Sequence, residues 1–159
     1  MIKKLKVDYR INKKEVKIMT TEKNKDVILK LVKEYWNEGR VDVLDEVFVP
    51  DFLDHHAAPG LKPGREGLKQ FVSMFRTSFS DISTTVNDLI AEGDKVAWNW
   101  TMRGTHSGEF MGVPATGKKI TFSGITIDKF IDGQIGERWS QADFAGLMQQ
   151  LGGMNNPVL

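Results

Sequence analysis

Cysteine is absent from the 159 residues, which excludes disulfides, thiolate metal sites and a thiol nucleophile. No apolar run reaches the roughly 20 residues that a membrane-spanning helix requires. The net charge is only +1, which argues against a strongly charged, disordered chain. We therefore expect a soluble protein with no membrane partner, and the missing cysteine fits the reducing conditions of the cytoplasm.

The composition that remains, 40% hydrophobic and 27% charged, is typical of one globular domain with a core. The charge is unevenly placed, because residues 1–18 carry a net +5 and leave −4 for the rest. We expect residues 1–18 to form a basic, disordered N-terminal arm and residues 19–159 to form the domain. Two other interpretations of the arm are an extension upstream of a start at Met19 and a nucleic-acid contact. The contact is disfavoured, because the arm has no aromatic stacking pattern beyond Tyr9, so we expect no nucleic-acid partner.

The spacing of apolar residues changes at about residue 80. Before it, a helical period predicts three helices, over 24–39 with Asn24 as N-cap, 42–48 and 68–79, and a short extended segment lies over 52–56. After it, alternation predicts strands over 82–88, 95–105, 118–131 and 134–143, then a helix over 144–151. Asp132-Gly133 is a strong hairpin signal. This order predicts an α+β fold with helices on one face of a curled sheet.

Several residue strings accompany this order of elements. They are Asp54-His55, Pro63-Gly64-Arg65-Glu66-Gly67, the segment 104–117 that begins Gly104-Thr105-His106-Ser107-Gly108, Phe122-Ser123-Gly124-Ile125, Glu137-Arg138-Trp139 with Asp143 following, and Gly146-Leu147-Met148-Gln149-Gln150-Leu151-Gly152. With them the chain resembles the SnoaL-like polyketide cyclase family of the nuclear-transport-factor-2-like superfamily. The resemblance implies a cone-shaped, strongly curved antiparallel sheet around three N-terminal helices. It also implies an apolar pocket for a hydrophobic small molecule, a homodimer, and chemistry without metal or cofactor.

Asp143 is the candidate catalytic base. It lies at the end of the last predicted strand, where a carboxylate beside indole and apolar walls is poorly solvated and accepts a proton more readily. The resemblance implies that an aspartate here removes a proton α to a carbonyl in an intramolecular aldol closure. The competing interpretation is that Asp143 caps the helix beginning at Phe144.

An enolate also needs hydrogen-bond donors close to its oxygen. His55 and His56 are consecutive in an extended segment, so they point to opposite faces and only one can enter the pocket. We take His55 as the catalytic one because it matches the family string, against the alternative of a buried structural histidine. The further candidates for ligand contact are His56, Trp98, Trp100, Asp128, Trp139 and Gln141. For any single tryptophan, ordinary core packing is the competing interpretation.

Two positions depart from the family pattern. Asp128 and Arg138 stand where cyclases of the family often carry histidine. If such a histidine is a catalytic acid, its loss removes the cyclase reaction but not the apolar pocket. The sequence thus supports a cofactor-independent cyclase or isomerase, with a non-catalytic binding or dimerisation module as the alternative. A third hypothesis, epoxide hydrolysis, would need Asp128 and Asp143 to flank a water.

Two apparent motifs are rejected. Residues 112–118 match the spacing of a phosphate-binding loop, but Lys119 stands where Ser or Thr would hold magnesium. The segment also leads into a predicted strand, whereas phosphate binding needs a helix N-terminus. Asp54 and His56 share a strand face, but no third ligand stands at metal-binding spacing, so we expect no metal site.

Overall fold

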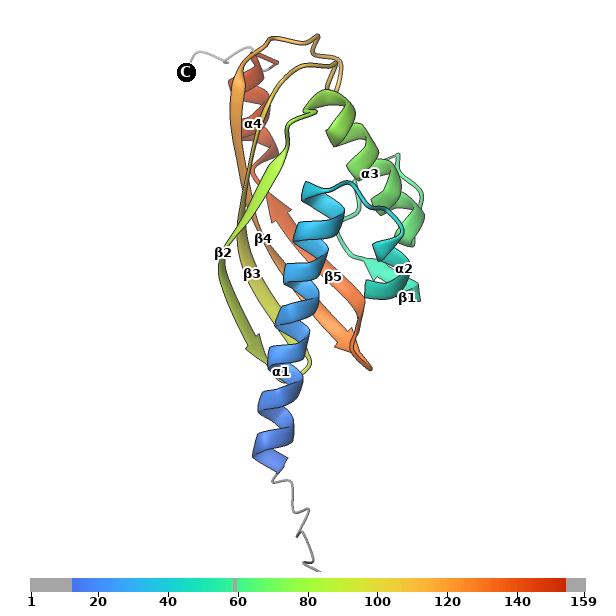
Figure 1. The fold of residues 1–159 in the computed structure, drawn as a ribbon. Helices are drawn as coiled ribbons and strands as arrows, with labels where there is room; N and C mark the ends of the chain where they lie inside the picture. Colours follow the sequence, from blue (N-terminus) through green and yellow to red (C-terminus); the bar gives the residue numbers. More distant parts are fainter. Residues whose placement is uncertain (1–12, 59, 154–159) are drawn as a thin grey trace, which may run out of the picture.

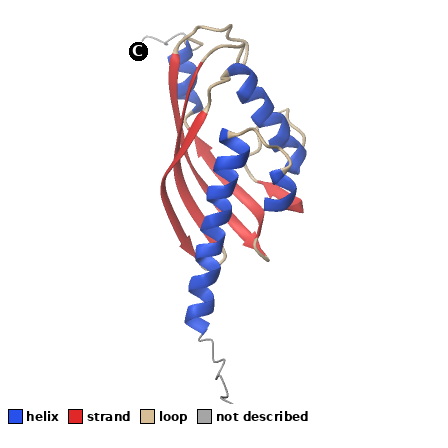
Figure 2. Ribbon diagram, in the orientation of Figure 1, coloured by secondary structure: helices blue, strands red, loops and turns tan. Residues whose placement is uncertain are grey.

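The computed structural model describes residues 13–58 and 60–153, in which helices cover one face of a curved sheet (Figures 1 and 2). The helices are α1 (Lys13–Lys30), its continuation η1 (Leu31–Asn37), α2 (Val43–Val47), α3 (Gly64–Ser78) and α4 (Phe144–Leu151). The strands are β1 (Phe48–Asp54), β2 (Ser83–Glu92), β3 (Lys95–Thr105), β4 (Lys119–Ile131) and β5 (Gln134–Ala142). The predicted α+β class is confirmed.

The five strands form one sheet in the order β1-β5-β4-β3-β2. Neighbours from β2 to β5 are antiparallel, as the alternating sequence predicts. The expected antiparallel sheet is nevertheless mixed, because β1 joins the edge parallel to β5, with Asp54 beside Arg138. β1 follows α2 and is connected to β5 through α3 and the strands β2 to β4, and a connection of this length allows two strands to pair in parallel.

The hairpin between β4 and β5 forms where the sequence predicts it. Asp132 and Gly133 both have positive φ, 49° and 85°. A two-residue turn with this backbone matches the right-handed twist of the flanking strands. The turn sets the pairing next to it, Phe130 with Ile135, and a register shift between Lys129 and Phe130 then places Asp128 opposite Arg138.

The first helix begins earlier than the sequence predicts. Asn24 is not an N-cap but a buried residue within α1, which starts at Lys13. Residues 13–38 contain no glycine or proline, so this segment has no residue that strongly disfavours a helix. The prediction of a disordered arm is therefore wrong for residues 13–18, and residues 1–12 lie outside the described part.

The first helix changes from α-helical to π-helical geometry in its last seven residues. Residues Leu31–Asn37 form a π-helix, a geometry that recurs at functional sites. It buries Tyr35, whose hydroxyl donates a hydrogen bond to the Leu68 carbonyl. Burial raises the pKa of Tyr35 well above its usual range. The same segment presents Trp36 and Asn37 toward the sheet side of the layer.

The core lies between the helices and the inner face of the sheet. Phe75 of α3 packs against Phe79, Phe110 and Phe122, with ring centroids 5.0 to 5.8 Å apart.

Among the described residues, no helix has both the length and the apolar character needed to cross a membrane.

Candidate functional site

A cavity of about 550 Å³ opens between α3 and the inner face of the sheet. Its walls are mostly hydrocarbon and aromatic, from Trp36, Leu61, Leu68, Phe71, Met74, Phe75, Trp98, Trp100, Met102, Met111, Phe122 and Phe144. The polar side chains on its wall are those of Asp54, His56, Lys62, Thr84, Thr126, Arg138, Ser140 and Gln141. This size and this balance of apolar and polar groups are typical of a small-molecule site.

Arg138 and Asp128 form a buried ion pair behind one wall of the cavity. Arg138 Nε lies 2.7 Å from Asp128 Oδ1, and Nη2 lies 3.1 Å from Oδ2. Trp98 Nε1 donates a third hydrogen bond to Asp128 Oδ2 at 2.9 Å. Three donors on one carboxylate hold both side chains in a single arrangement.

The guanidinium of Arg138 keeps part of its donor capacity for the cavity. Burial lowers its pKa, but the charge and hydrogen bonds of Asp128 outweigh that effect and raise it, so the group stays charged. Its centre lies 5.0 Å from the ring centroid of Phe48. Within the described residues, the two N–H groups on Nη1 have no hydrogen-bond partner, and Arg138 lines the cavity.

Asp54 and His56 lie on the same cavity wall as Arg138. Asp54 ends β1 directly beside Arg138, and its Oδ1 accepts a hydrogen bond from the His56 backbone N–H at 3.0 Å. His56 Nδ1 lies 3.1 Å from the Ser140 carbonyl oxygen. A carbonyl only accepts, so we assign the proton of the neutral ring to Nδ1, which leaves Nε2 able to accept one.

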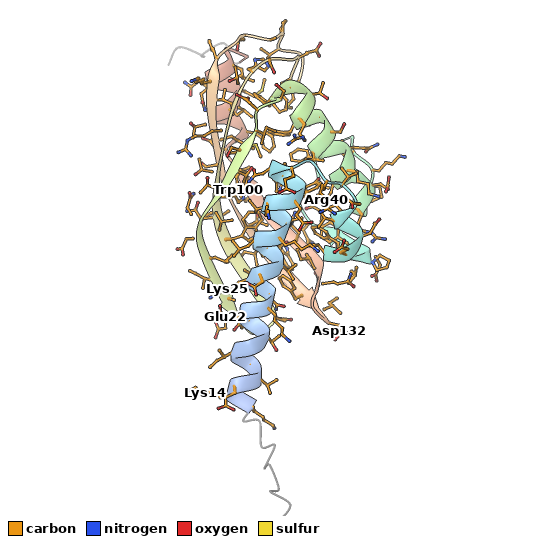
Figure 3. All side chains as sticks on the ribbon, in the orientation of Figure 1. Lys14, Glu22, Lys25, Arg40, Trp100 and Asp132 are labelled. Carbon is orange, nitrogen blue, oxygen red and sulfur yellow. The ribbon has the colours of Figure 1, made fainter. Side chains whose placement is uncertain are left out.

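Three side chains form a hydrogen-bonded row across the sheet. Trp100 Nε1 donates to Thr126 Oγ1 at 3.1 Å, and Thr126 Oγ1 lies 2.9 Å from Ser140 Oγ. Because Thr126 is buried and already accepts from Trp100, we assign its hydroxyl as the donor to Ser140 Oγ. The Ser140 hydroxyl can then donate a hydrogen bond to a ligand in the cavity. Trp100 lies in the interior, where side chains crowd between sheet and helices (Figure 3).

Asp143 lies outside this arrangement. It is exposed, it is not among the residues that line the cavity, and its Oδ1 accepts a hydrogen bond from the Gly146 N–H at 2.8 Å. The expectation that Asp143 is desolvated is wrong, because the strand ends at Ala142 and Asp143 turns to cap α4. The capping interpretation describes its contacts.

His55 and Trp139 face the other side of the sheet. The two histidines do point to opposite faces, but the structure brings His56 rather than His55 to the cavity. His55 stacks on Trp139 with ring centroids 4.3 Å apart, and its Nε2 lies 2.9 Å from Glu137 Oε2. Placing His55 and Trp139 in the pocket is therefore wrong, and the reason is the two-residue period of β5, on which Trp139 alternates with Arg138 and Ser140.

The remaining predicted contacts divide between the wall and its support. His56, Trp98, Trp100 and Gln141 line the cavity, whereas Asp128 lies behind the wall and holds Arg138. The sequence analysis missed Asp54 and Arg138 as site residues. Arg138 has a detectable signal, since the strands predicted on both sides of the Asp132-Gly133 turn bring it close to Asp128, which is of opposite charge.

The curved α+β fold with its enclosed apolar cavity is that of the nuclear-transport-factor-2-like proteins. The family model for SnoaL-like polyketide cyclases matches residues 26–151, so the chain belongs to this family and the resemblance drawn from the sequence is confirmed.

The relatives include enzymes and solved structures from Streptomyces. The chain is 29% identical over 119 residues to the nogalonic acid methyl ester cyclase of Streptomyces nogalater, over 74% of this chain and 89% of that protein. The structure of TsrD from Streptomyces laurentii is similar with a TM-score of 0.76 and 28% identity, over 84% and 97% of the two chains. That of wild-type IdmH from Streptomyces antibioticus has a TM-score of 0.71 and 35% identity, over 81% and 98%.

Proposed function

We propose that the protein is a cofactor-independent cyclase that acts on a hydrophobic carbonyl compound by removing a proton α to the carbonyl. The observation that carries this proposal is that Asp54 and Arg138, which has free N–H groups, lie side by side on one wall of an apolar cavity. A base and an oxyanion donor are the two groups that enolate chemistry requires. Asp54 thus takes the role for which the sequence suggested Asp143.

The proposed reaction balances without any other reagent. The Asp54 carboxylate accepts the proton from the α-carbon, and the electron pair of that C–H bond forms an enolate whose oxygen is bound by Arg138. The enolate carbon then attacks a second carbonyl of the same molecule, which forms the ring bond and an alkoxide. Asp54 returns its proton to the alkoxide and is regenerated.

The surroundings of the pair favour this step. Asp128 forms the ion pair with Arg138, so the guanidinium has its own counter-ion and Asp54 is not its ion-pair partner. The three donors on Asp128 also hold the guanidinium in place before the substrate arrives, which is how an oxyanion site gains its effect. His56 Nε2, on the same cavity wall, is a second proton acceptor beside the Asp54 carboxylate.

The family relationship supports an aromatic polyketide ester as the substrate class. The name of the Streptomyces nogalater relative specifies nogalonic acid methyl ester, and the aromatic walls of this cavity, which include Trp98 and Trp100, suit a flat ligand of that kind. We use this ester as the first substrate in the test below.

Two matched variants test the assignment of the base. Asp54→Asn is expected to lower kcat by about 100-fold or more while ligand still binds, and Asp143→Asn is expected to keep kcat within a few-fold, since Asn also caps helices. Turnover is followed by chromatography of the ester and its product. Loss of turnover in Asp143→Asn alone overturns the assignment, and a wild type that binds the ester without converting it supports the binding module instead.

We also propose that the protein forms a homodimer through the outer face of the sheet. Cross-strand register aligns Ile90, Ala97, Ile127 and Trp139 in one row over β2, β3, β4 and β5. Ile90 and Ile127 are 62% and 39% exposed, and Ile125 beside them is 56% exposed. An apolar row of this extent on one face is typical of an association surface.

A further inference from the structure

Thr84 presents an unused polar group to the cavity. It lies on β2, lines the cavity and is only 5% exposed, yet its Oγ1 has no hydrogen-bond partner among the described residues. A buried hydroxyl without a partner destabilises the fold, and native structures rarely keep one without a reason. The group is therefore a candidate for ligand contact.

The backbone of Thr84 is held rigidly from the helical layer. Asn37, at the end of η1, accepts a hydrogen bond from the Thr84 N–H at 2.6 Å and donates one to its carbonyl at 3.0 Å. These two bonds fix the residue on both of its main-chain groups. The Thr84 side chain is consequently kept at the cavity wall, and neither contact uses its hydroxyl.

The cross-strand neighbours of Thr84 are apolar. Its cross-strand partner is Met102, which in turn faces Phe122 on β4, and both line the cavity. The hydroxyl is thus a single polar point within an apolar end of the site. A ligand atom that hydrogen-bonds to this hydroxyl is held in a defined orientation, which the surrounding apolar side chains cannot provide.

Thr84 and Arg138 line different parts of the cavity. Arg138 pairs with Asp128 of β4, whereas the row of Thr84 and Met102 meets β4 at Phe122. The two rows are six positions apart on β4, about 20 Å measured along the curved strand and less in a straight line across the cavity. A ligand that contacts both is long, and its two polar groups stand at its two ends.

We propose that the Thr84 hydroxyl is a specificity-determining group that binds a second oxygen function, a carbonyl or a hydroxyl, at the end of an elongated apolar ligand remote from Arg138. This inference rests on the proposed function only in that the cavity must bind the substrate. It adds that the ligand is oriented by hydrogen bonds at both ends.

The test compares two probes that differ by one terminal hydroxyl. Anthraflavic acid has a hydroxyl at each end of its three fused rings, and its monohydroxy analogue lacks one of them. Binding is measured by quenching of tryptophan fluorescence, because Trp36, Trp98 and Trp100 line the cavity. The wild type is expected to prefer anthraflavic acid by about 3- to 10-fold.

Thr84→Val removes the hydroxyl while keeping the shape of the side chain, and is expected to abolish that preference. Thr84→Ser keeps the hydroxyl and the preference, and Thr85→Val, on the exposed neighbour, leaves it unchanged. A preference that persists in Thr84→Val, or a wild type that binds both probes equally, overturns the proposed role of Thr84 but leaves the proposed function standing. A wild type that binds neither probe overturns this inference together with the proposed ligand class.

Discussion

Asp128 and Arg138 face each other across the β4–β5 hairpin, where a register shift between Lys129 and Phe130 brings the carboxylate opposite the guanidinium and within hydrogen-bonding distance of two of its nitrogens. The Asp132-Gly133 turn leads to the pairing of Phe130 with Ile135, and the shift of one residue beyond it places Asp128 opposite Arg138 instead of Glu137. Both residues are at most 5% exposed, so their interaction is little screened by solvent.

Removing one partner of this pair is expected to be costly. Asp128→Asn leaves the Arg138 charge buried with weaker compensation and is expected to lower the free energy of unfolding by about 3 to 5 kcal/mol. Urea denaturation followed by circular dichroism measures this. The control is Asp128→Leu combined with Arg138→Met, which removes both charges and is expected to recover much of the stability but no turnover. Full activity in that double variant would exclude Arg138 from the mechanism.

Gly124 is expected to be essential for the shape of the cavity. A Cβ at this position would lie 2.5 Å from both Trp100 Cζ2 and the Gln141 carbonyl oxygen. Gly124→Ala is therefore expected to displace the indole and to lower the free energy of unfolding by about 1 to 3 kcal/mol. Ligand binding should weaken in parallel, as measured by tryptophan fluorescence. Ser123→Ala, on the exposed neighbour, should alter neither quantity.

Glu137 is expected to give the outer face an acid-sensitive contribution to stability. The hydrogen bond from Lys129 Nζ at 2.7 Å, and then the contact with His55, lower the pKa of Glu137. A carboxyl whose pKa is lower in the folded state stabilises the fold above its unfolded pKa, about 4.3, and stops doing so as the pH falls through its folded pKa.

The measurement compares the wild type with Glu137→Gln across acid pH. The difference in unfolding free energy should shrink as the pH falls below about 4. Glu92→Gln, at the exposed end of β2, controls for the loss of one carboxylate. A difference that grows as the pH falls below about 4 would contradict the assigned direction.

The proposed dimer is tested by placing a charge in the apolar row. Ile127→Lys is expected to convert the dimer to monomer, because burying an unpaired ammonium in such a contact is unfavourable. Sedimentation equilibrium gives the mass directly. Val41→Lys adds the same charge at an exposed apolar position away from the sheet and should leave the mass unchanged. A monomeric wild type at micromolar concentration would remove the proposal.

The sequence predicts the strands better than the site, for a physical reason. Alternation around Trp98 and Trp100 determines which of their neighbours face inward, and Asp132-Gly133 determines the hairpin, so β3 to β5 follow from local pattern. Which face Asp143 takes depends on where the strand ends, and a shift of one residue turns a pocket carboxylate into a helix cap.

Contacts between distant segments are harder to predict. The parallel pairing of β1 with β5 brings Asp54 beside Arg138 from 84 positions away, and no local pattern specifies it. The same holds for Asn37 and Thr84, which meet only because η1 packs on β2. The early start of α1 was missed for the opposite reason, since the hydrophobic stripe begins only after several exposed turns.

The two walls of the cavity differ in what they contribute. The sheet side supplies Arg138, Ser140, Thr126 and Thr84, whereas α3 supplies Leu68, Phe71, Met74 and Phe75. Substitutions on α3 can therefore reshape the space available to a ligand while the proton-handling groups stay in register on their strands. Such a separation allows related proteins to accept different substrates through substitutions on a single helix, while the reaction chemistry stays the same.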